Sequence, residues 1–441
     1  MQHRRWGTGA DRLAISTAPA AAATVNPSLN ENDSRLRWIV ERTPVLVVAG
    51  QELTDEVCER LLRDSGTIVV THRYDGQVVV RSVRIRSGDE PHTSEWPLEL
   101  ANCCVDCTIR DDLLILLRRL HRRDDVSRIV VHLAPWLEPE PVCWAINNVD
   151  VHVGPGYVDG PAARDVAIQA VVSTVATSQW LIDALSADEL DDDRTVAQVV
   201  VGQAEFADVL VLSEREYRTH AVLRRLTPRA SIVVGVGLLP ATLDAMKSNP
   251  RRDHDYDPHA PLLAGEPPLA ADGDVQIIEF EANRPFHPMR LHLAIDELLD
   301  GVVRIKGRVW LASQPDTVVW IESAGGGLRV GDAGRWLAGS SPDEQREADP
   351  DRVALASLRW DEEFGDRHVS LTALVCGADP DRITRVLSGA LLTDEELSHP
   401  EAWTDYDDPF GEWHEDPCDG LDKVEDACAP ERPDGEDFAG R

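Results

Sequence analysis

The spacing of hydrophobic residues divides the chain into two patterned regions, which begin near residue 43 and near residue 275. In the first region, short runs of consecutive apolar residues alternate with segments in which apolar residues recur every three or four positions. Such runs are typical of strands buried on both faces, and the longer period is typical of amphipathic helices. This alternation predicts an α/β domain with a mostly parallel sheet. We predict its strands at residues 44–50, 67–71, 77–83, 127–133, 167–175, 208–212 and 231–235, and helices at 55–63 and from residue 104.

The second region groups its strands together instead of alternating each one with a helix. Runs of strands with helices to one side are typical of an α+β domain. Residues 248–274, which are rich in Pro, Asp, Gly and His and lack any period, predict a linker before this domain. We predict strands at 275–280, 303–312, 317–323 and 369–375, and helices at 288–299 and 379–392.

The two ends of the chain show no sustained period. The first is rich in Ala, Ser, Asn and Arg and predicts a disordered arm, or a start codon assigned too early. The last is strongly acidic and predicts a solvated, disordered tail. The predicted organisation is an arm at 1–42, an α/β domain at 43–247, a linker at 248–274, an α+β domain at 275–404 and a tail at 405–441.

The charge balance limits the classes of partner. The chain has 78 acidic and 44 basic residues, and its net charge of −34 opposes binding to nucleic acid because neutralising phosphates requires clustered Lys and Arg. Any RNA contact would have to use local arginine patches at the ends of two predicted helices; the alternative is that these arginines form a solvated face that complements the helix dipoles. They are Arg118, Arg119, Arg122, Arg123, Arg224, Arg225 and Arg229.

The sequence predicts neither a membrane span nor a signal peptide. No stretch approaches 18 consecutive apolar residues, and no continuous apolar region follows Arg4 and Arg5. Eight cysteines without regular spacing do not resemble a secreted disulfide framework. We therefore expect a cytoplasmic protein without a membrane contact.

Three cysteines, Cys103, Cys104 and Cys107, lie within five residues at the start of a predicted amphipathic helix. The positive end of a helix dipole favours thiolate, which is the form that binds metal. The Cys104-x-x-Cys107 spacing is common in zinc sites, and Cys103 or the carboxylate of Asp106 would supply a third ligand. Two alternatives remain open, namely cysteines packed as small buried side chains and a disulfide between Cys104 and Cys107. Candidate donors from other segments are His72, His132, His152 and Cys143.

Other residues carry weaker chemical signals. His287 lies between two nearby prolines and predicts a turn residue packed against the sheet. His414 and Cys418 have metal-ligand spacing if helical, but the acidic residues around them favour an unstructured tail. Core positions are predicted for Cys58, Cys143 and Cys376.

Residues 99–113 (Glu-Leu-Ala-Asn-Cys-Cys-Val-Asp-Cys-Thr-Ile-Arg-Asp-Asp-Leu) resemble the E-L-x-N-G-C-x-C-C-x-x-R-x-D-L motif of the CobW-like family of P-loop GTPases and zinc metallochaperones. Cys104 and Cys107 stand at the first and third family cysteines, Asp106 replaces the middle one, and Cys103 replaces the glycine. The resemblance implies a P-loop GTPase fold for the first domain, a CobW C-terminal fold for the second, and zinc as the metal. The second region resembles that family in residues 284–288, 303–307, 310–312, 325–329 and 392–396.

Within this family, the chain looks closest to an actinobacterial branch that recruits a ribosome hibernation factor under zinc limitation. Residues 109–125, 132–139 and 406–414 carry this closer resemblance. It implies the ribosome and a hibernation factor as partners.

The family's nucleotide-binding motifs are missing from this chain. A P-loop, G-x-x-x-x-G-K-[ST], binds phosphates through backbone amides and a lysine, and binds Mg²⁺ through its hydroxyl. At the equivalent position, residues 49–55 (Ala-Gly-Gln-Glu-Leu-Thr-Asp) retain only Gly50 and have no lysine. The segment 132–135 replaces E-x-x-G, Ala176 replaces the aspartate at the end of the next strand, and 213–216 replaces N-K-x-D. We therefore predict no catalytic and no cofactor-binding residues, and we do not expect GTP to bind.

Two classes of function follow. The first is a non-catalytic adaptor, linked to zinc starvation, that recruits a hibernation factor to the 70S ribosome. The alternative is a GTP-dependent zinc metallochaperone with a remodelled pocket. A third, a zinc sensor without hydrolysis, would load Cys104 and Cys107 only when zinc is plentiful.

Overall fold

The computed structural model describes residues 42–87, 90–100, 104–192, 194–246, 262–263 and 265–411. Most of the predicted N-terminal arm and the tail from residue 412 lie outside this range. The same is true of three candidate ligands, Cys103, His414 and Cys418.

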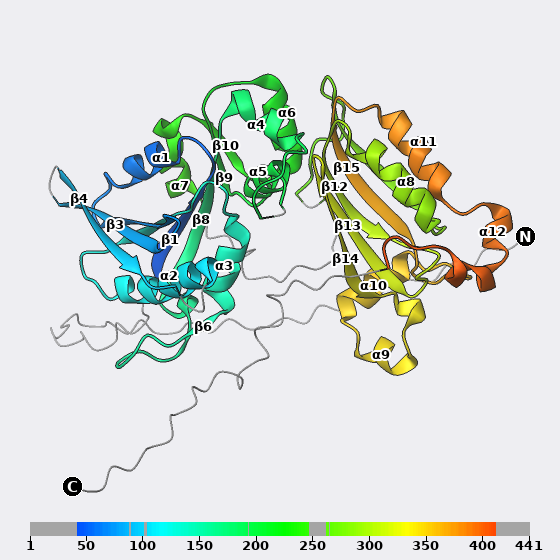
Figure 1. The fold of residues 1–441 in the computed structure, drawn as a ribbon, viewed down its shortest axis with the longest axis horizontal. Helices are drawn as coiled ribbons and strands as arrows, with labels where there is room; N and C mark the ends of the chain where they lie inside the picture. The colour runs from blue at the N-terminus through cyan, green and yellow to red at the C-terminus, as the bar shows by residue number, and fades with distance from the viewer. Residues whose placement is uncertain are drawn as a thin grey trace, which may run out of the picture. The chain divides into compact units, whose positions relative to one another are not determined.

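The first domain is built on one eight-stranded sheet (Figure 1). Its strands are β1 (Thr43–Ala49), β2 (Thr67–Tyr74), β3 (Val79–Ser87), β4 (Glu90–Leu98), β5 (Arg128–His132), β8 (Val166–Val175), β9 (Val209–Leu212) and β10 (Ser231–Val234). Their order across the sheet is β10-β9-β8-β1-β5-β2-β3-β4. The strands from β10 to β2 run parallel, whereas β3 and β4 add antiparallel strands at one edge. The predicted α/β class with a mostly parallel sheet is confirmed.

Helices cover both faces of this sheet. They are α1 (Thr54–Leu61), α2 (Val105–His121), α3 (Pro139–Asn148), α4 (Thr177–Ala184), α5 (Val196–Glu205), α6 (Tyr217–Leu226) and α7 (Leu239–Ala245). In the central strand β1, Leu46 packs in one cluster with Val57 of α1, and Val47 packs in another with Leu117 of α2. All four side chains are fully buried. Since successive strand residues point to opposite faces, both faces gain from burial and the strand is continuously apolar.

The second domain is a five-stranded antiparallel sheet with two helices on one face (Figure 1). Its strands are β11 (Val275–Ala282), β12 (Val302–Val309), β13 (Thr317–Ala324), β14 (Gly327–Arg335) and β15 (Val369–Cys376), in the order β11-β15-β12-β13-β14. Its helices are α8 (Pro288–Leu299), α9 (Pro342–Glu347), α10 (Pro350–Leu358), α11 (Pro380–Ala390) and α12 (Asp394–Leu397). The predicted α+β class of this domain is confirmed.

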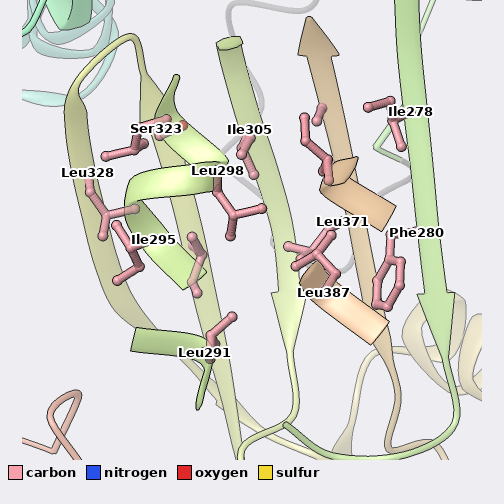
Figure 2. Close-up of a pocket in the computed structure, with 14 residues that line it drawn as sticks. Ile278, Phe280, Leu291, Ile295, Leu298, Ile305, Ser323, Leu328, Leu371 and Leu387 are labelled. Carbon is pink, nitrogen blue, oxygen red and sulfur yellow. The ribbon is translucent and has the colours of Figure 1, made fainter. Parts of the chain in front are cut away.

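The space between α8, α11 and the sheet is hydrophobic core (Figure 2). Leu291 and Leu298 of α8 and Leu387 of α11 point toward Ile305 and Leu371 of the sheet. The cavity left among these side chains has a volume of about 30 Å³. A volume of that size holds about one water molecule, so this region is packing and not a ligand site.

The packed chain continues beyond Thr404, into the segment predicted as a disordered tail. The Tyr406 ring stacks on His287 with 4.5 Å between the ring centroids, and Phe410 is buried in the core of the second domain. Apolar contacts therefore order residues 406–410, which the acidic composition of this segment did not predict.

Candidate functional site

The cysteine pair forms the N-terminal cap of α2. Cys104 has extended backbone angles, and its Sγ accepts a hydrogen bond from the backbone N–H of Cys107 at 3.3 Å. The Thr108 hydroxyl donates to the Cys104 carbonyl at 2.7 Å. The two thiols therefore lie side by side at the positive end of the helix dipole, as the sequence predicted.

The pKa values of the two thiols are shifted in opposite directions. The backbone N–H of Cys107 stabilises the Cys104 thiolate and lowers the pKa of Cys104 below its ordinary value. The hydrogen bond to Cys104, together with burial, raises the pKa of Cys107 to about 11. Cys104 therefore ionises more readily than Cys107, and a metal bound to both sulfurs would displace the Cys107 proton.

The structure does not complete a ligand set around this pair. Asp106 lies on the first turn of α2 and is exposed. Among the described residues, no group of three or more His, Cys, Asp or Glu side chains has an arrangement that could hold a metal ion. The metal-site prediction at Cys104, Asp106 and Cys107, with Cys103 outside the described residues, therefore remains a prediction.

The candidate donors from other segments have other contacts. His72 Nε2 lies 2.8 Å from Asp112 Oδ2, and His152 Nδ1 lies 2.8 Å from Asp159 Oδ1. His132 lies at the end of β5, where burial lowers its pKa. Cys143 is buried in α3. Cys58 and Cys376 are buried as well, so the prediction that these three cysteines are core residues is confirmed.

A polar network that the sequence reasoning missed connects α2 to the sheet. The Asp112 carboxylate, on α2, lies against His72 of β2 and accepts a hydrogen bond from Arg81 of β3 at 2.7 Å. The Arg81 guanidinium also lies over the Trp96 ring, 4.8 Å from its centroid. Asp112 is the aspartate of the R-x-D-L part of the cysteine motif, and this match was the feature of the sequence that could have indicated the network. The network fixes the helix that carries the cysteines.

The segment at the P-loop position is short and closed against a neighbouring strand. Four residues, Gly50 to Leu53, connect β1 to α1. The Thr174 hydroxyl donates to the carbonyl oxygens of Ala49 and Glu52. Gly50 has φ 131°, and a Cβ there would lie 2.0 Å from Thr174 Oγ1. The glycine is therefore explained by contact with Thr174, without any phosphate.

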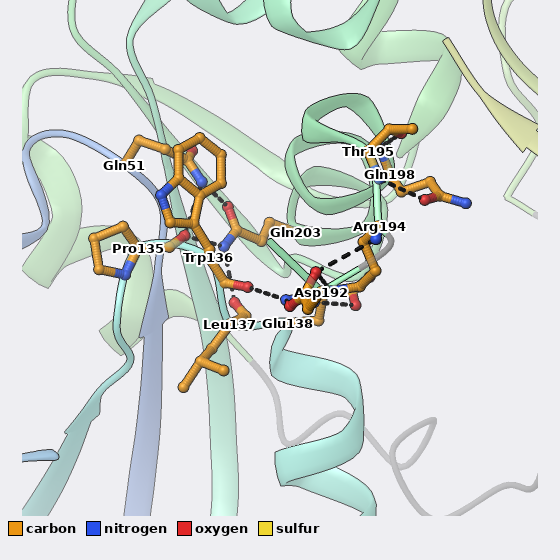
Figure 3. Close-up of polar contacts among 10 residues, drawn as sticks. All are labelled: Gln51, Pro135, Trp136, Leu137, Glu138, Asp192, Arg194, Thr195, Gln198 and Gln203. Atoms are coloured by element: carbon orange, nitrogen blue, oxygen red, sulfur yellow. Dashed lines mark hydrogen bonds and ion pairs between the residues drawn. The ribbon is translucent and has the colours of Figure 1, made fainter. Parts of the chain in front are cut away.

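Gln51 belongs to this loop, and its side-chain amide is hydrogen-bonded to other residues of the protein (Figure 3). Its Nε2 donates to the Pro135 carbonyl at 2.8 Å and to Gln203 Oε1 at 3.0 Å. Gln203, which is 1% exposed, donates at 2.8 Å to the carbonyls of both Pro135 and Leu137. The loop is thus tied to the segment after β5 and to α5 by neutral amides.

Residues 213–216, which stand where the family has its guanine-binding motif, precede α6 and supply its N-terminal cap. The Glu216 carboxylate caps α6 by accepting hydrogen bonds from the backbone N–H groups of Arg218 at 3.0 Å and Thr219 at 2.6 Å. These bonds lower the pKa of Glu216, although its partial burial opposes them. A carboxylate so engaged is not oriented to accept the ring protons of guanine.

Two of the arginines predicted to form a basic surface are buried instead. Arg118 is 1% exposed and donates to Asp165 at 2.8 Å and to the Val158 carbonyl at 2.7 Å. Arg225 is 7% exposed and donates to the Ala270 carbonyl at 2.6 Å. For these two residues the expectation of an exposed patch is wrong, because each is surrounded by carbonyl or carboxylate acceptors inside the domain.

The described part of the chain has no helix that is both long enough and apolar enough to cross a membrane.

The fold and the cysteine-capped helix define a class of protein with a nucleotide-binding type of α/β domain followed by a smaller antiparallel domain. Two family models match these domains. The model described as the CobW/HypB/UreG nucleotide-binding domain matches residues 69–232, and the cobalamin synthesis protein cobW C-terminal domain matches residues 275–391. The chain belongs to the CobW family.

The chain is similar to several known proteins. A protein of Mycobacterium tuberculosis named as a zinc chaperone is 58% identical over 395 residues, which are 90% of this chain and 99% of that protein. The zinc-regulated GTPase metalloprotein activator 1 of Dictyostelium discoideum is 24% identical over 72% of this chain and 70% of its own length. The crystal structure of the Zn(II)-bound YjiA GTPase from E. coli matches 79% of this chain and 99% of that chain, with 13% identity and a TM-score of 0.33.

Proposed function

We propose that this protein binds and transfers zinc as a metallochaperone, with Cys104 and Cys107 as the core of its metal site. The observation that carries the proposal is the placement of two neighbouring thiols at the N-terminus of α2, where the backbone N–H of Cys107 donates to Cys104 Sγ and lowers the pKa of Cys104. Thiolates are the ligands that zinc takes in such spacings. The relative from Mycobacterium tuberculosis that is named as a zinc chaperone supports the same chemistry. Asp106 and Cys103 are the nearest additional donors in the sequence.

We further propose that the protein works without the phosphate contacts of a P-loop. Gln51 and Gln203 satisfy each other and two backbone carbonyls, so neither amide is free to bind phosphate. Asp55 is 84% exposed at the start of α1, where its charge repels an anion. In this proposal, zinc binding to the cysteine site depends on the zinc concentration and not on a cycle of GTP binding and hydrolysis.

A chelator competition tests the metal site. We expect the wild-type chain to retain one zinc ion against a chromophoric chelator, and C104S/C107S to lose it. The control is H152A, which removes an exposed candidate donor outside the cysteine motif and should bind zinc as the wild type does. Equal zinc retention by wild type and C104S/C107S would refute the metal site.

A titration with a fluorescent GTP analogue, with and without zinc, tests the nucleotide proposal separately. We expect no saturable binding in either condition. Saturable binding followed by hydrolysis would restore the GTP-dependent alternative and leave the zinc result unaffected.

The ribosome and a hibernation factor remain predicted partners, which rest only on the sequence resemblance of residues 109–125, 132–139 and 406–414. Neither of the two relatives compared above has a name that refers to the ribosome. Affinity purification from zinc-limited and zinc-replete cells would test these partners, and absence of both from both samples would remove the adaptor function.

A further inference from the structure

Helix α10 and the residue two positions beyond it expose apolar side chains that a folded domain would ordinarily bury. No residue of α10 is buried. Leu358 is 82% exposed, Trp360 51%, Val353 40% and Leu355 38%. Leu355 and Leu358 are three positions apart, which puts them on the same side of the helix. Figure 1 shows α9 and α10, in yellow, at one end of the five-stranded sheet.

Negative charge surrounds this apolar row. Residues 343–363 contain eight Asp or Glu and three Arg, which gives this segment a net charge of −5. Asp351 precedes Leu355 by four positions and Leu358 by seven, so a carboxylate lies on the same helical face. Glu362 and Glu363 follow Trp360 and are exposed.

The three arginines of the segment are already included in this net charge, and each has an acidic or carbonyl partner. Arg346 pairs with Asp343, and Arg352 donates to the carbonyl of Arg335. Arg359 pairs with Glu281 at 2.7 Å. The face around Leu355 and Leu358 is therefore apolar at its centre and acidic at its edge.

We propose that α10 and Trp360 form a docking surface for a basic amphipathic segment of another protein. Apolar side chains of that segment would cover Leu355 and Leu358, and its Lys or Arg side chains would pair with the surrounding carboxylates. A second copy of this chain would bring the same net charge of −5 to the contact and be repelled. Anionic lipid and nucleic acid are repelled for the same reason.

The test is calorimetric titration of the full chain with a helical peptide that repeats Leu at positions i, i+3, i+4 and i+7 and has Lys elsewhere. We expect this peptide to bind the wild type, and L355Q/L358Q to weaken the binding at least tenfold without changing the melting temperature. The matched control is L293Q on α8, where the side chain is 73% exposed, and it should change binding less than twofold.

Three results would overturn the proposal. The first is equal affinity of L355Q/L358Q and L293Q for the peptide, which would show attraction to the net charge alone. The second is equal binding of a peptide with Glu in place of Lys. The third is a wild-type dimer in solution that L355Q/L358Q converts to a monomer, which would identify a second copy as the occupant.

Discussion

At the residue scale, Cys104 and Cys107 differ in pKa although they share one motif, because hydrogen bonds between them act in opposite directions and burial adds to the effect on Cys107. Cys104 accepts the backbone N–H of Cys107, and this bond stabilises negative charge on Cys104. Cys107 lies in the first turn of α2, and its hydrogen bond to Cys104 together with burial opposes its own ionisation. The spacing of the cysteines was evident in the sequence, but this asymmetry was not, because it depends on the cap geometry of Cys104.

Alkylation at increasing pH should reveal this asymmetry. Because Cys104 has a lowered pKa, its thiolate is populated at lower pH than that of an ordinary cysteine, and iodoacetamide should modify it first. Cys107 should react only as the pH rises toward about 11. Peptide mass spectrometry of the zinc-free protein measures both, with buried Cys58, whose pKa is raised to about 12, as an unreactive control. Faster modification of Cys107 than of Cys104 at neutral pH would contradict the assignment.

At the scale of elements, the sequence predicted buried strands and helices more accurately than exposed ones. The runs in β1, β5 and β9 predicted central parallel strands because both of their faces are covered. Strand β4 was missed because nearly all its residues are exposed and it contains two prolines, so only pairing with β3 defines it. The loss of P-loop residues was evident from the sequence, whereas the replacement contact between Gln51 and Gln203 required the structure, since these residues are far apart in the chain.

Removing the carboxylate that fixes α2 should loosen the helix that carries the cysteines. D112A leaves His72, which is 6% exposed, and Arg81 without their shared acceptor, and we expect it to lower the free energy of unfolding by about 2–4 kcal/mol. Urea denaturation measures the loss. D111A is the matched control, because Asp111 is half-exposed and pairs with neighbouring Arg110, and it should change stability by less than about 0.5 kcal/mol. Equal effects of the two substitutions would show that the network does not anchor α2.

At the scale of the whole molecule, the net charge of −34 affects partners and stability together. The sequence predicted the sign of the net charge correctly. It did not predict that two arginines, Arg118 and Arg225, are buried. Their burial leaves less positive charge at the surface to offset the carboxylates. Like charges on a compact chain repel one another, and unfolding relieves that repulsion by separating them.

Salt should therefore stabilise the folded protein at neutral pH. The Debye length falls from about 30 Å at 0.01 M to about 8 Å at 0.15 M ionic strength, which screens repulsion between exposed carboxylates. We expect the melting temperature at pH 7 to rise over this range of sodium chloride concentration. Near the sequence pI of about 4.7 the net charge approaches zero, so the same addition should have little effect there. Differential scanning calorimetry at both pH values makes the comparison. A melting temperature that falls with salt at pH 7 would show that ion pairs between opposite charges, such as Arg118 with Asp165, outweigh the net repulsion.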